Sequence, residues 1–243
     1  MPPWANQDPP PADEPQPPAD DATLPAAPLS GVRTALRDYF ETGNRDSARN
    51  ALGRYSRAMG GRSASPRHAR GARTGGSAIA AFAAIAAAGG AAVVVQSFDL
   101  GTLTGLPLDE AIAAVVDRFC PPGILDEDIV RGAVAEALFE ALGGVDLFDP
   151  AAVDNHVIVV ATTCFVAELV FAAITSEQGA AAENVAPEVA VRRENNLRDL
   201  IRAVADQVAI PIIQQVGGAL SPATIEGIVA QITAAVYGEM AQW

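Results

Sequence analysis

The chain of 243 residues has no lysine, only two cysteines and two histidines, and an aromatic content of 5%. With only Cys120 and Cys164, a disulfide-stapled scaffold and a four-cysteine zinc site are excluded, and such usage is typical of a reducing cytoplasm. The two histidines, His68 and His156, argue against a histidine-rich metal site and a Ser-His relay. Half of the residues are hydrophobic, mostly alanine and small aliphatics, which favours helices over a β-sandwich.

Sequence signatures of catalysis are missing as well. The chain contains no GxxxxGK[ST], GxSxG or HExxH pattern. Cys120 precedes two prolines and Cys164 lies among apolar residues, which is typical of buried packing. Gly75-Gly76-Ser77 precedes an apolar run and suits an anion at a helix N-terminus, although the pattern is short and common. We therefore predict no catalytic, metal-binding or cofactor-binding residue, and a protein that is not an enzyme.

Charge divides the chain into three segments. Residues 1–30 hold five acidic residues and no base. Residues 31–75 hold ten arginines against three acids, a charge of +7. Residues 76–243 hold 21 acids against six arginines, a charge of −15. Binding of DNA without sequence preference would work against the field of so acidic a body, so direct nucleic-acid binding is not the favoured function.

The first segment is proline-rich. Ten of residues 1–30 are proline, which removes amide donors and disfavours helix. Because large apolar residues are scarce there, we expect residues 1–28 to form a disordered or polyproline II arm. The arm has neither the basic start nor the apolar run of a signal peptide. Trp4, after Pro2 and Pro3, is either a chance exposed residue or a short anchor for a partner protein.

The second segment, residues 29–75, predicts two short helices and a basic row. Helical spacing of apolar residues indicates one helix from about Ser30 to Gly43 and another from Asn44 or Asp46 to Gly60-Gly61. The arginines singled out as a candidate partner surface are Arg54, Arg57, Arg67, Arg70 and Arg73. Arg67, Arg70 and Arg73 are three residues apart, so on a helix they form a basic row. Alternatively, this row is a solvated face, forms salt bridges to the acidic body, or contacts phosphates.

Residues 74–98 form a 25-residue stretch without charge, long enough to span a bilayer. Its residues are mainly alanine and glycine, whereas a membrane span is richer in leucine, isoleucine and phenylalanine. We therefore expect a close-packed buried helix that ends near Gly89, with a membrane-associated protein as a less favoured alternative. The run from Val157 to Ile174 contains Glu168 and is interpreted as a core helix.

The rest of the chain predicts further helices and hardly any strand. Capping and proline signals place helix starts at Pro107, Asp126, Asp149-Pro150, Pro187 and Ser221-Pro222. Pro211 is expected to kink or break the helix that begins at Pro187. Residues 91–98 are the one β-branched run that suits a strand. The expected fold is all-α, a compact multi-helix domain of residues 76–243 preceded by the arginine-rich helical segment 29–75 and the arm 1–28.

Three stretches of sequence resemble the B component of the Qat anti-phage defence system of bacteria. They are "ALRDYFETGNRDSARNALGRYSRAMGGRSASPRHARGARTGGSAIAAF", "LTGLPLDEAIAAVVDRFCPPGILDEDIVRGAVAEAL" and "LSPATIEGIVAQITAAVYGEM", after a proline-rich start with "PPW". The resemblance implies a small, helical, non-enzymatic component encoded beside an ATPase, a QueC-like nucleotide-binding enzyme and a TatD-like nuclease. It also implies that the QueC-like protein is the direct partner.

The resemblance has one departure, at the N-terminus. Family members typically begin Met-Gly-Thr-Ser, and related systems use an N-terminal glycine as the acceptor of a deazaguanine-type conjugation. This chain begins Met1-Pro2-Pro3-Trp4 and has no glycine before Gly31, so either its start is truncated or this member lacks the acceptor. The favoured function is a cytoplasmic adaptor or substrate that binds the QueC-like protein and, as a further possible partner, the ATPase. The alternatives are an arginine-rich nucleic-acid-binding module and, third, the membrane-associated protein.

Overall fold

The computed structural model describes residues 29–63, 66–91, 93–122, 125–216 and 220–243, without the side chains of residues 66, 67, 125 and 126. Over these ranges the chain forms eight α-helices and one pair of two-residue strands. The expected all-α fold is therefore confirmed. The predicted arm, residues 1–28 with Pro2, Pro3 and Trp4, lies outside the described residues.

The helices follow one another with short connections. They are α1 (Leu29–Thr42), α2 (Arg45–Ala58), α3 (Pro66–Ala87), α4 (Leu108–Phe119), α5 (Leu125–Ala141), α6 (Asn155–Thr175), α7 (Pro187–Val216) and α8 (Pro222–Met240). Four short 3₁₀ turns lie at Gly61–Ser63, Leu100–Leu103, Pro150–Ala152 and Gly179–Ala182. Strands β1 (Val94–Val95) and β2 (Phe98–Asp99) pair antiparallel, so the one run that suited a strand does contribute to one.

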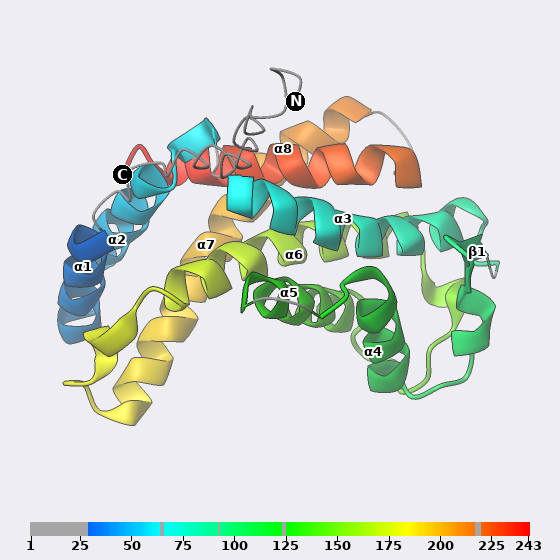
Figure 1. The fold of residues 1–243 in the computed structure, drawn as a ribbon, viewed down its shortest axis with the longest axis horizontal. Coiled ribbons are helices and arrows are strands. Elements are labelled where there is room, and N and C mark those ends of the chain that lie inside the picture. The colour runs from blue at the N-terminus through cyan, green and yellow to red at the C-terminus, as the bar shows by residue number, and fades with distance from the viewer. Residues whose placement is uncertain (1–28, 64–65, 92, 123–124, 217–219) are drawn as a thin grey trace, which may run out of the picture.

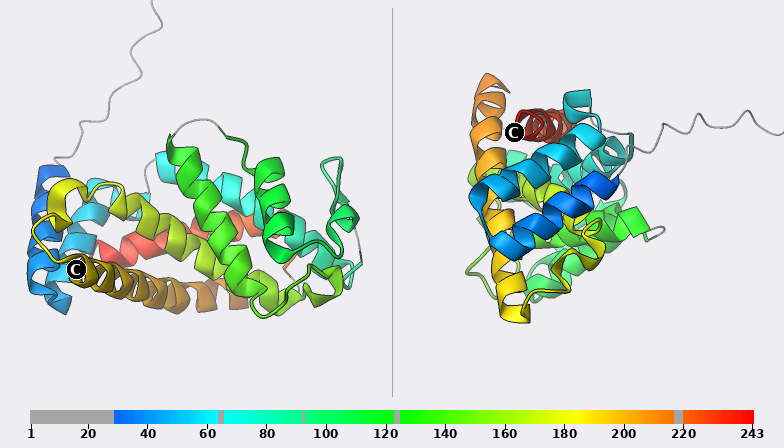
Figure 2. Two further views of the ribbon diagram at one scale, coloured as in Figure 1. Left: turned by 90° about the horizontal axis from the view of Figure 1, so that it is seen from below. Right: turned by 90° about the vertical axis from the view of Figure 1, so that its left-hand side faces the viewer.

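The helices form an elongated body around α6. Helices α1 and α2 pair at one end, and the β1–β2 hairpin lies at the other (Figure 1). Between these ends, α3 runs along α8, while α5 and α7 pack against α6 (Figure 2). Every residue from 161 to 170 of α6 is buried, because neighbouring helices cover it on several sides. Buried residues of α1 and α2 belong to the same hydrophobic cluster as those of α3 to α8.

Helix α3 is the close-packed buried helix expected from the alanine-rich stretch. It ends at Ala87, and Gly89 and Gly90 follow with φ of 67° and 81°. The amide of Gly90 donates to the carbonyl of Ile85 at 3.0 Å, a glycine-terminated helix end. The expected end near Gly89 is therefore confirmed. The helix is continuous across residues 75 and 76, where the composition changes from arginine-rich to alanine-rich.

The glycines of α3 serve packing. Gly75 and Gly76 lie inside α3, so no helix begins there, and the anion site that the sequence analysis weighed but did not predict is excluded. A Cβ atom on Gly75 would lie 2.0 Å from Cζ of the Phe165 ring on α6. A Cβ atom on Gly76 would lie 3.2 Å from Cα of Glu226 on α8. Because only a hydrogen fits at Gly75, α3 approaches α6 closely.

Capping signals located some helix starts and misplaced others. The Asn44 side chain accepts the amide of Asp46 at the start of α2, and Ser221 is the N-cap of α8, as expected. Asp149, expected to open the long core helix, caps only the turn Pro150–Ala152. Helix α6 begins at Asn155 because Asp154 accepts the amide of Val157 at 2.9 Å. Asp126, the other expected cap, lies inside the first turn of α5.

Of the two outcomes expected at Pro211, a kink or a break, the break is excluded, because α7 runs on to Val216. Proline lacks an amide hydrogen, so the carbonyl of Gln207 loses its helical donor. Pro211 and Gln207 are both exposed, and water therefore reaches that side of the helix.

Candidate functional site

The predicted partner-binding arginines come from two helices that meet α8. Arg54 and Arg57 lie on α2, whereas Arg67, Arg70 and Arg73 lie on α3. The side chain of Arg67 is outside the description, and the other four arginines are exposed. Pro2, Pro3 and Trp4 lie outside the described residues, so their contact with a partner stays a prediction.

Arg57 binds within the chain. Its Nη1 donates to the main-chain carbonyls of Ala241 at 2.6 Å and Trp243 at 2.8 Å. A Cβ atom on Gly53, one turn earlier in α2, would lie 2.5 Å from the carbonyl oxygen of Trp243. The guanidinium of Arg49 lies 5.4 Å from the centre of the Trp243 ring, within the range of a cation–π contact. Helix α2 therefore holds residues 241–243 with a glycine and two arginines.

Arg70 and Arg73 differ from Arg57 in their surroundings. Among the described residues, neither has a hydrogen bond or ion pair. Arg54 differs, since its Nε donates to the side-chain oxygen of Asn50 at 3.1 Å. Three residues apart on α3, Arg70 and Arg73 form the exposed basic row that the spacing predicted. Arg73 lines a shallow pocket of 330 Å³ together with Glu127 and Glu226, so its surroundings are not purely basic.

Beside the arginines, a buried aromatic cluster joins α2, α3 and α8. The hydroxyl of Tyr55 lies 3.3 Å from Nε2 of His68, and the His68 ring centre lies 4.8 Å from that of Tyr237. The hydroxyl of Ser56 donates to the main-chain carbonyl of Tyr237. His68 is 5% exposed, so its role is to pack these three helices together. This histidine and both tyrosines were not predicted to meet.

A buried acid in α6 organises a second cluster, which the sequence analysis also missed. Glu168 is 4% exposed. Its carboxylate lies 3.4 Å from Nε of Arg198 and 3.1 Å from Nη2 of Arg202, both on α7. Arg202 also lies 3.8 Å from the Glu140 carboxylate of α5 and within 3.5 Å of the Cys164 sulfur. The cluster therefore ties α5, α6 and α7 together.

Burial dominates the protonation of this cluster. Desolvation raises the pKa of Glu168, and the charges of Arg198 and Arg202 oppose that rise. Burial raises the pKa of the Cys164 thiol to about 11, although Arg202 lowers it. The pKa of Cys120 is likewise raised to about 11 by burial. Both cysteines are therefore protonated at neutral pH, which makes them poor nucleophiles.

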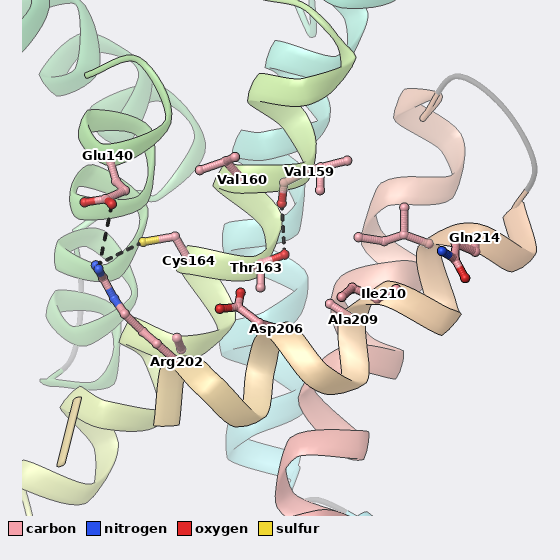
Figure 3. A pocket seen from close by; sticks show the side chains of 12 residues that line it. Glu140, Val159, Val160, Thr163, Cys164, Arg202, Asp206, Ala209, Ile210 and Gln214 are labelled. Carbon is pink, nitrogen blue, oxygen red and sulfur yellow. Dashed lines mark hydrogen bonds and ion pairs between the residues drawn. The ribbon is translucent and has the colours of Figure 1, made fainter. Parts of the chain in front are cut away.

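A groove of 640 Å³ opens beside the acid cluster, between α6 and α7 (Figure 3). Val159, Val160 and Ala167 line it from α6, and Ala209, Ile210 and Ile213 line it from α7. Its polar lining residues are Glu140, Thr163, Cys164, Arg202, Asp206 and Gln214. Thr163 donates to the carbonyl of Val159 at 3.0 Å, so this hydroxyl is engaged within α6. The groove is mainly apolar, with acidic groups near its edge.

Clusters of metal-ligating side chains and long apolar helices bear on chemistry and location. Over the parts of the chain that the structure describes, no group of three or more histidine, cysteine, aspartate or glutamate side chains is arranged to hold a metal ion. In the same residues, α6 is the one helix long and apolar enough to cross a membrane, and 78% of its most apolar window is buried in the protein. The core helix of a protein can be equally long and apolar, and the buried position of α6 agrees with its interpretation from sequence as a core helix.

Comparisons with known proteins give one result. The family model described as Qat anti-phage system associated protein QatB matches residues 59–240. Searches of curated proteins and of solved structures returned no match. The matched residues include Arg70 and Arg73 of α3, His68 and Tyr237 of the buried aromatic cluster, and the groove between α6 and α7, whereas Tyr55 and Ser56 on α2 precede them. The chain belongs to the QatB family, whose members are components of the Qat anti-phage system.

Proposed function

We propose that the chain is a non-enzymatic adaptor or substrate of the Qat system, located in the cytoplasm, that binds the system's QueC-like component. The observation that carries the proposal is the exposed pair Arg70 and Arg73, which have no hydrogen bond or ion pair among the described residues. An exposed basic row on an acidic protein, with a formal net charge of −13, offers a distinct surface to an acidic partner.

The proline-rich arm supplies the second half of the proposed contact. Trp4 with Pro2 and Pro3 serves as an apolar anchor, and a polyproline chain loses less entropy on binding than a glycine-rich one. Buried tryptophans dominate the binding energy of many interfaces. Exposed arginines act mainly on the rate of association. The arm therefore sets how long the complex lasts, and the basic row sets how fast it forms.

Non-enzymatic action is supported by the chemistry of the thiols. Cys120 and Cys164 are buried, and both have a pKa of about 11. Among the described residues, the hydrogen-bonding neighbour of the Cys164 sulfur is Arg202, and no carboxylate or histidine is hydrogen-bonded to either sulfur. A nucleophilic cysteine needs the opposite arrangement, an accessible thiol with a lowered pKa.

Surface plasmon resonance with the purified QueC-like protein tests the proposal. Trp4→Ala should weaken binding about thirtyfold, mostly through faster dissociation, because a central aromatic anchor is lost. The double variant Arg70→Ala with Arg73→Ala should slow association, with a smaller effect at high salt. The matched control is Arg192→Ala, an exposed arginine on α7. An unchanged dissociation rate for Trp4→Ala would show that the arm is not the anchor.

A titration of binding against salt concentration separates a nucleic-acid-binding function from a protein-binding one. Affinity for duplex DNA should fall steeply with the logarithm of salt concentration if phosphates are the ligand. Glu127 and Glu226 beside Arg73 disfavour that outcome, since acidic side chains repel phosphates. Salt-sensitive DNA binding that is lost in the Arg70 and Arg73 variant would replace the proposed function.

A further inference from the structure

The last two turns of α7, residues 210–216, lie outside the core although they are rich in apolar residues. Ala209 is 1% exposed, and no residue from 210 to 216 is buried. Ile210 is 56% exposed and Val216 is 38% exposed, with half-buried Ile212 and Ile213 between them. These four residues are the apolar patch of α7; Ile210 and Ile213 lie one turn apart on the same face, and exposed apolar surface of this kind marks an interaction site.

This patch continues into the groove between α6 and α7. Ile210 and Ile213 belong to both, and Val159 and Val160, which are themselves half-buried, line the same groove from α6. The cavity of 640 Å³ is therefore a trough with one wall from each helix. A trough between two helices matches the ridge of side chains on a third helix.

Acidic side chains outnumber basic ones at the groove. Arg202, the lining arginine, is engaged by Glu168 at 3.1 Å and by Glu140 at 3.8 Å. Asp206 projects from α7 into the space between α6 and α7 (Figure 3). Asp206 is exposed and has no hydrogen bond or ion pair within the described ranges. The Glu140 side chain is 51% exposed. An incoming basic group therefore finds at least one unpaired carboxylate.

We propose that this groove binds an amphipathic helix of another protein, with an apolar stripe that packs on Ile210, Ile213 and Val160 and a lysine or arginine beside the stripe that pairs with Asp206. The apolar stripe supplies most of the affinity, because it covers aliphatic side chains that are otherwise exposed to water. The basic flank supplies orientation and selectivity.

Two other occupants fit the charges poorly. A second copy packed through the same face on a two-fold axis would bring Asp206 and Glu140 of one chain toward those of the other. The chain's own arm, residues 1–28, carries five acids and no base. Both would place acid against acid in an apolar surrounding, which is unfavourable. A basic partner helix relieves the imbalance instead.

This surface is separate from the one proposed for the QueC-like protein. The groove belongs to α5, α6 and α7, whereas Arg54, Arg57, Arg70 and Arg73 belong to α2 and α3. The groove-binding test therefore uses no residue of the basic row or of the arm. Its failure leaves the proposed function untouched, and failure of the proposed function leaves the groove-binding test informative.

The test uses the full chain and two designed fluorescent peptides, with binding measured by anisotropy. Both peptides are amphipathic helices with the same apolar stripe, and they differ only in lysine or glutamate beside that stripe. We expect the lysine peptide to bind about tenfold tighter than the glutamate peptide, with the preference shrinking at high salt. Asp206→Arg should reverse the preference. Equal binding of the two peptides, or no binding of either, overturns the proposal.

Two charge-introducing variants on α7 locate the binding site. Ile210→Glu should weaken binding of the lysine peptide about tenfold or more, because it places a charge in the apolar trough. Val191→Glu is the matched control, since Val191 lies on the same helix and is 55% exposed, against 56% for Ile210. Circular dichroism confirms that both variants fold.

Three results contradict the proposed site. Unchanged peptide binding in Ile210→Glu overturns it. An equal loss of binding in Val191→Glu also overturns it, because an added charge anywhere on α7 would then have the same effect. Sedimentation equilibrium of the full chain measures whether the protein self-associates. A dimer that Ile210→Glu dissociates would assign the face to a second copy and overturn the proposed partner helix.

Discussion

Helices α3 and α6 both carry a long apolar run into the core, yet they pack by different means. Helix α3 is rich in alanine and glycine, and its backbone comes so close to α6 that a Cβ atom on Gly75 would lie 2.0 Å from the Phe165 ring. Helix α6 packs through large side chains and carries the buried Glu168, which two arginines of α7 neutralise. Shape therefore specifies the place of α3, whereas charge pairing helps to specify the place of α6.

The difference teaches which substitutions each helix tolerates. Where packing depends on the absence of a side chain, one added methyl group is a steric conflict. Where it depends on a buried ion pair, removal of one partner leaves an uncompensated charge. The two mechanisms predict separate failures, and each can be tested against a matched site on the same protein.

The largest effect is expected from Gly75→Ala. We expect a loss of about 3 kcal/mol in the free energy of unfolding, because the new Cβ atom overlaps the fully buried Phe165 ring. Gly132→Ala on α5 is the control, since its Cβ atom meets nothing within 4 Å, and the higher helix propensity of alanine should stabilise it by about 0.5 to 1 kcal/mol. Urea unfolding measures both. Equal effects in the two variants would show that α3 and α6 are not in tight contact at Gly75.

A smaller loss is expected from Arg202→Ala. Removing this guanidinium leaves Glu168 with Arg198 alone, and we expect a loss of about 2 kcal/mol. Arg192→Ala, an exposed arginine on the same helix, should change stability by less than about 0.5 kcal/mol. A double variant, Arg202→Ala with Glu168→Leu, tests whether the buried charge is the cause. Because it removes both charges, it should recover most of the stability that Arg202→Ala loses. If the double variant were less stable than Arg202→Ala, the buried charge would not be the cause.

The smallest effect is a pH dependence from Glu168. Burial raises the pKa of this carboxyl in the folded chain above its ordinary value of 4.5. The folded state therefore binds the proton more tightly than the unfolded state, and the stability gained from it is full below the unfolded pKa. That contribution is lost as pH rises through the folded pKa. Relative to wild type, Glu168→Gln should lose this dependence in urea unfolding between about pH 4 and 7. A wild-type stability that rises relative to the variant over that range would show that Arg198 and Arg202 outweigh burial.

The fold could be predicted from the sequence to the extent that local signals set it. Apolar spacing and the caps at Asn44 and Ser221 predicted helices that the structure contains. Where two signals compete, as with Asp149 and Asp154 five residues apart, spacing alone does not say which caps the longer helix. The sequence did not decide between a kink and a break at Pro211, because the cost of proline in a helix depends on whether water reaches the freed carbonyl, which is a tertiary property.

The buried clusters were beyond a single sequence for a different reason. Arg198 and Arg202 are four residues apart, so they share a face of α7, but nothing in the spacing says that this face meets Glu168. The one usable signal was the acid itself, since a glutamate inside a long apolar helix requires a partner. The groove at Ile210 was hidden likewise, because an isoleucine of the core and one at the surface look alike in sequence.

The attachment of α2 to the last residues has a consequence for how the protein is made. Ser56 binds the carbonyl of Tyr237, 181 residues later, and Arg57 binds carbonyls of residues 241 and 243. At a synthesis rate of about 5–20 residues per second, α2 waits roughly ten to forty seconds on the ribosome before these contacts exist. During that time the surface of α2 that packs on α8 has no contact with that helix. The nascent chain therefore keeps this surface of α2 exposed until α8 emerges, and exposed apolar surface of this kind is what chaperones bind.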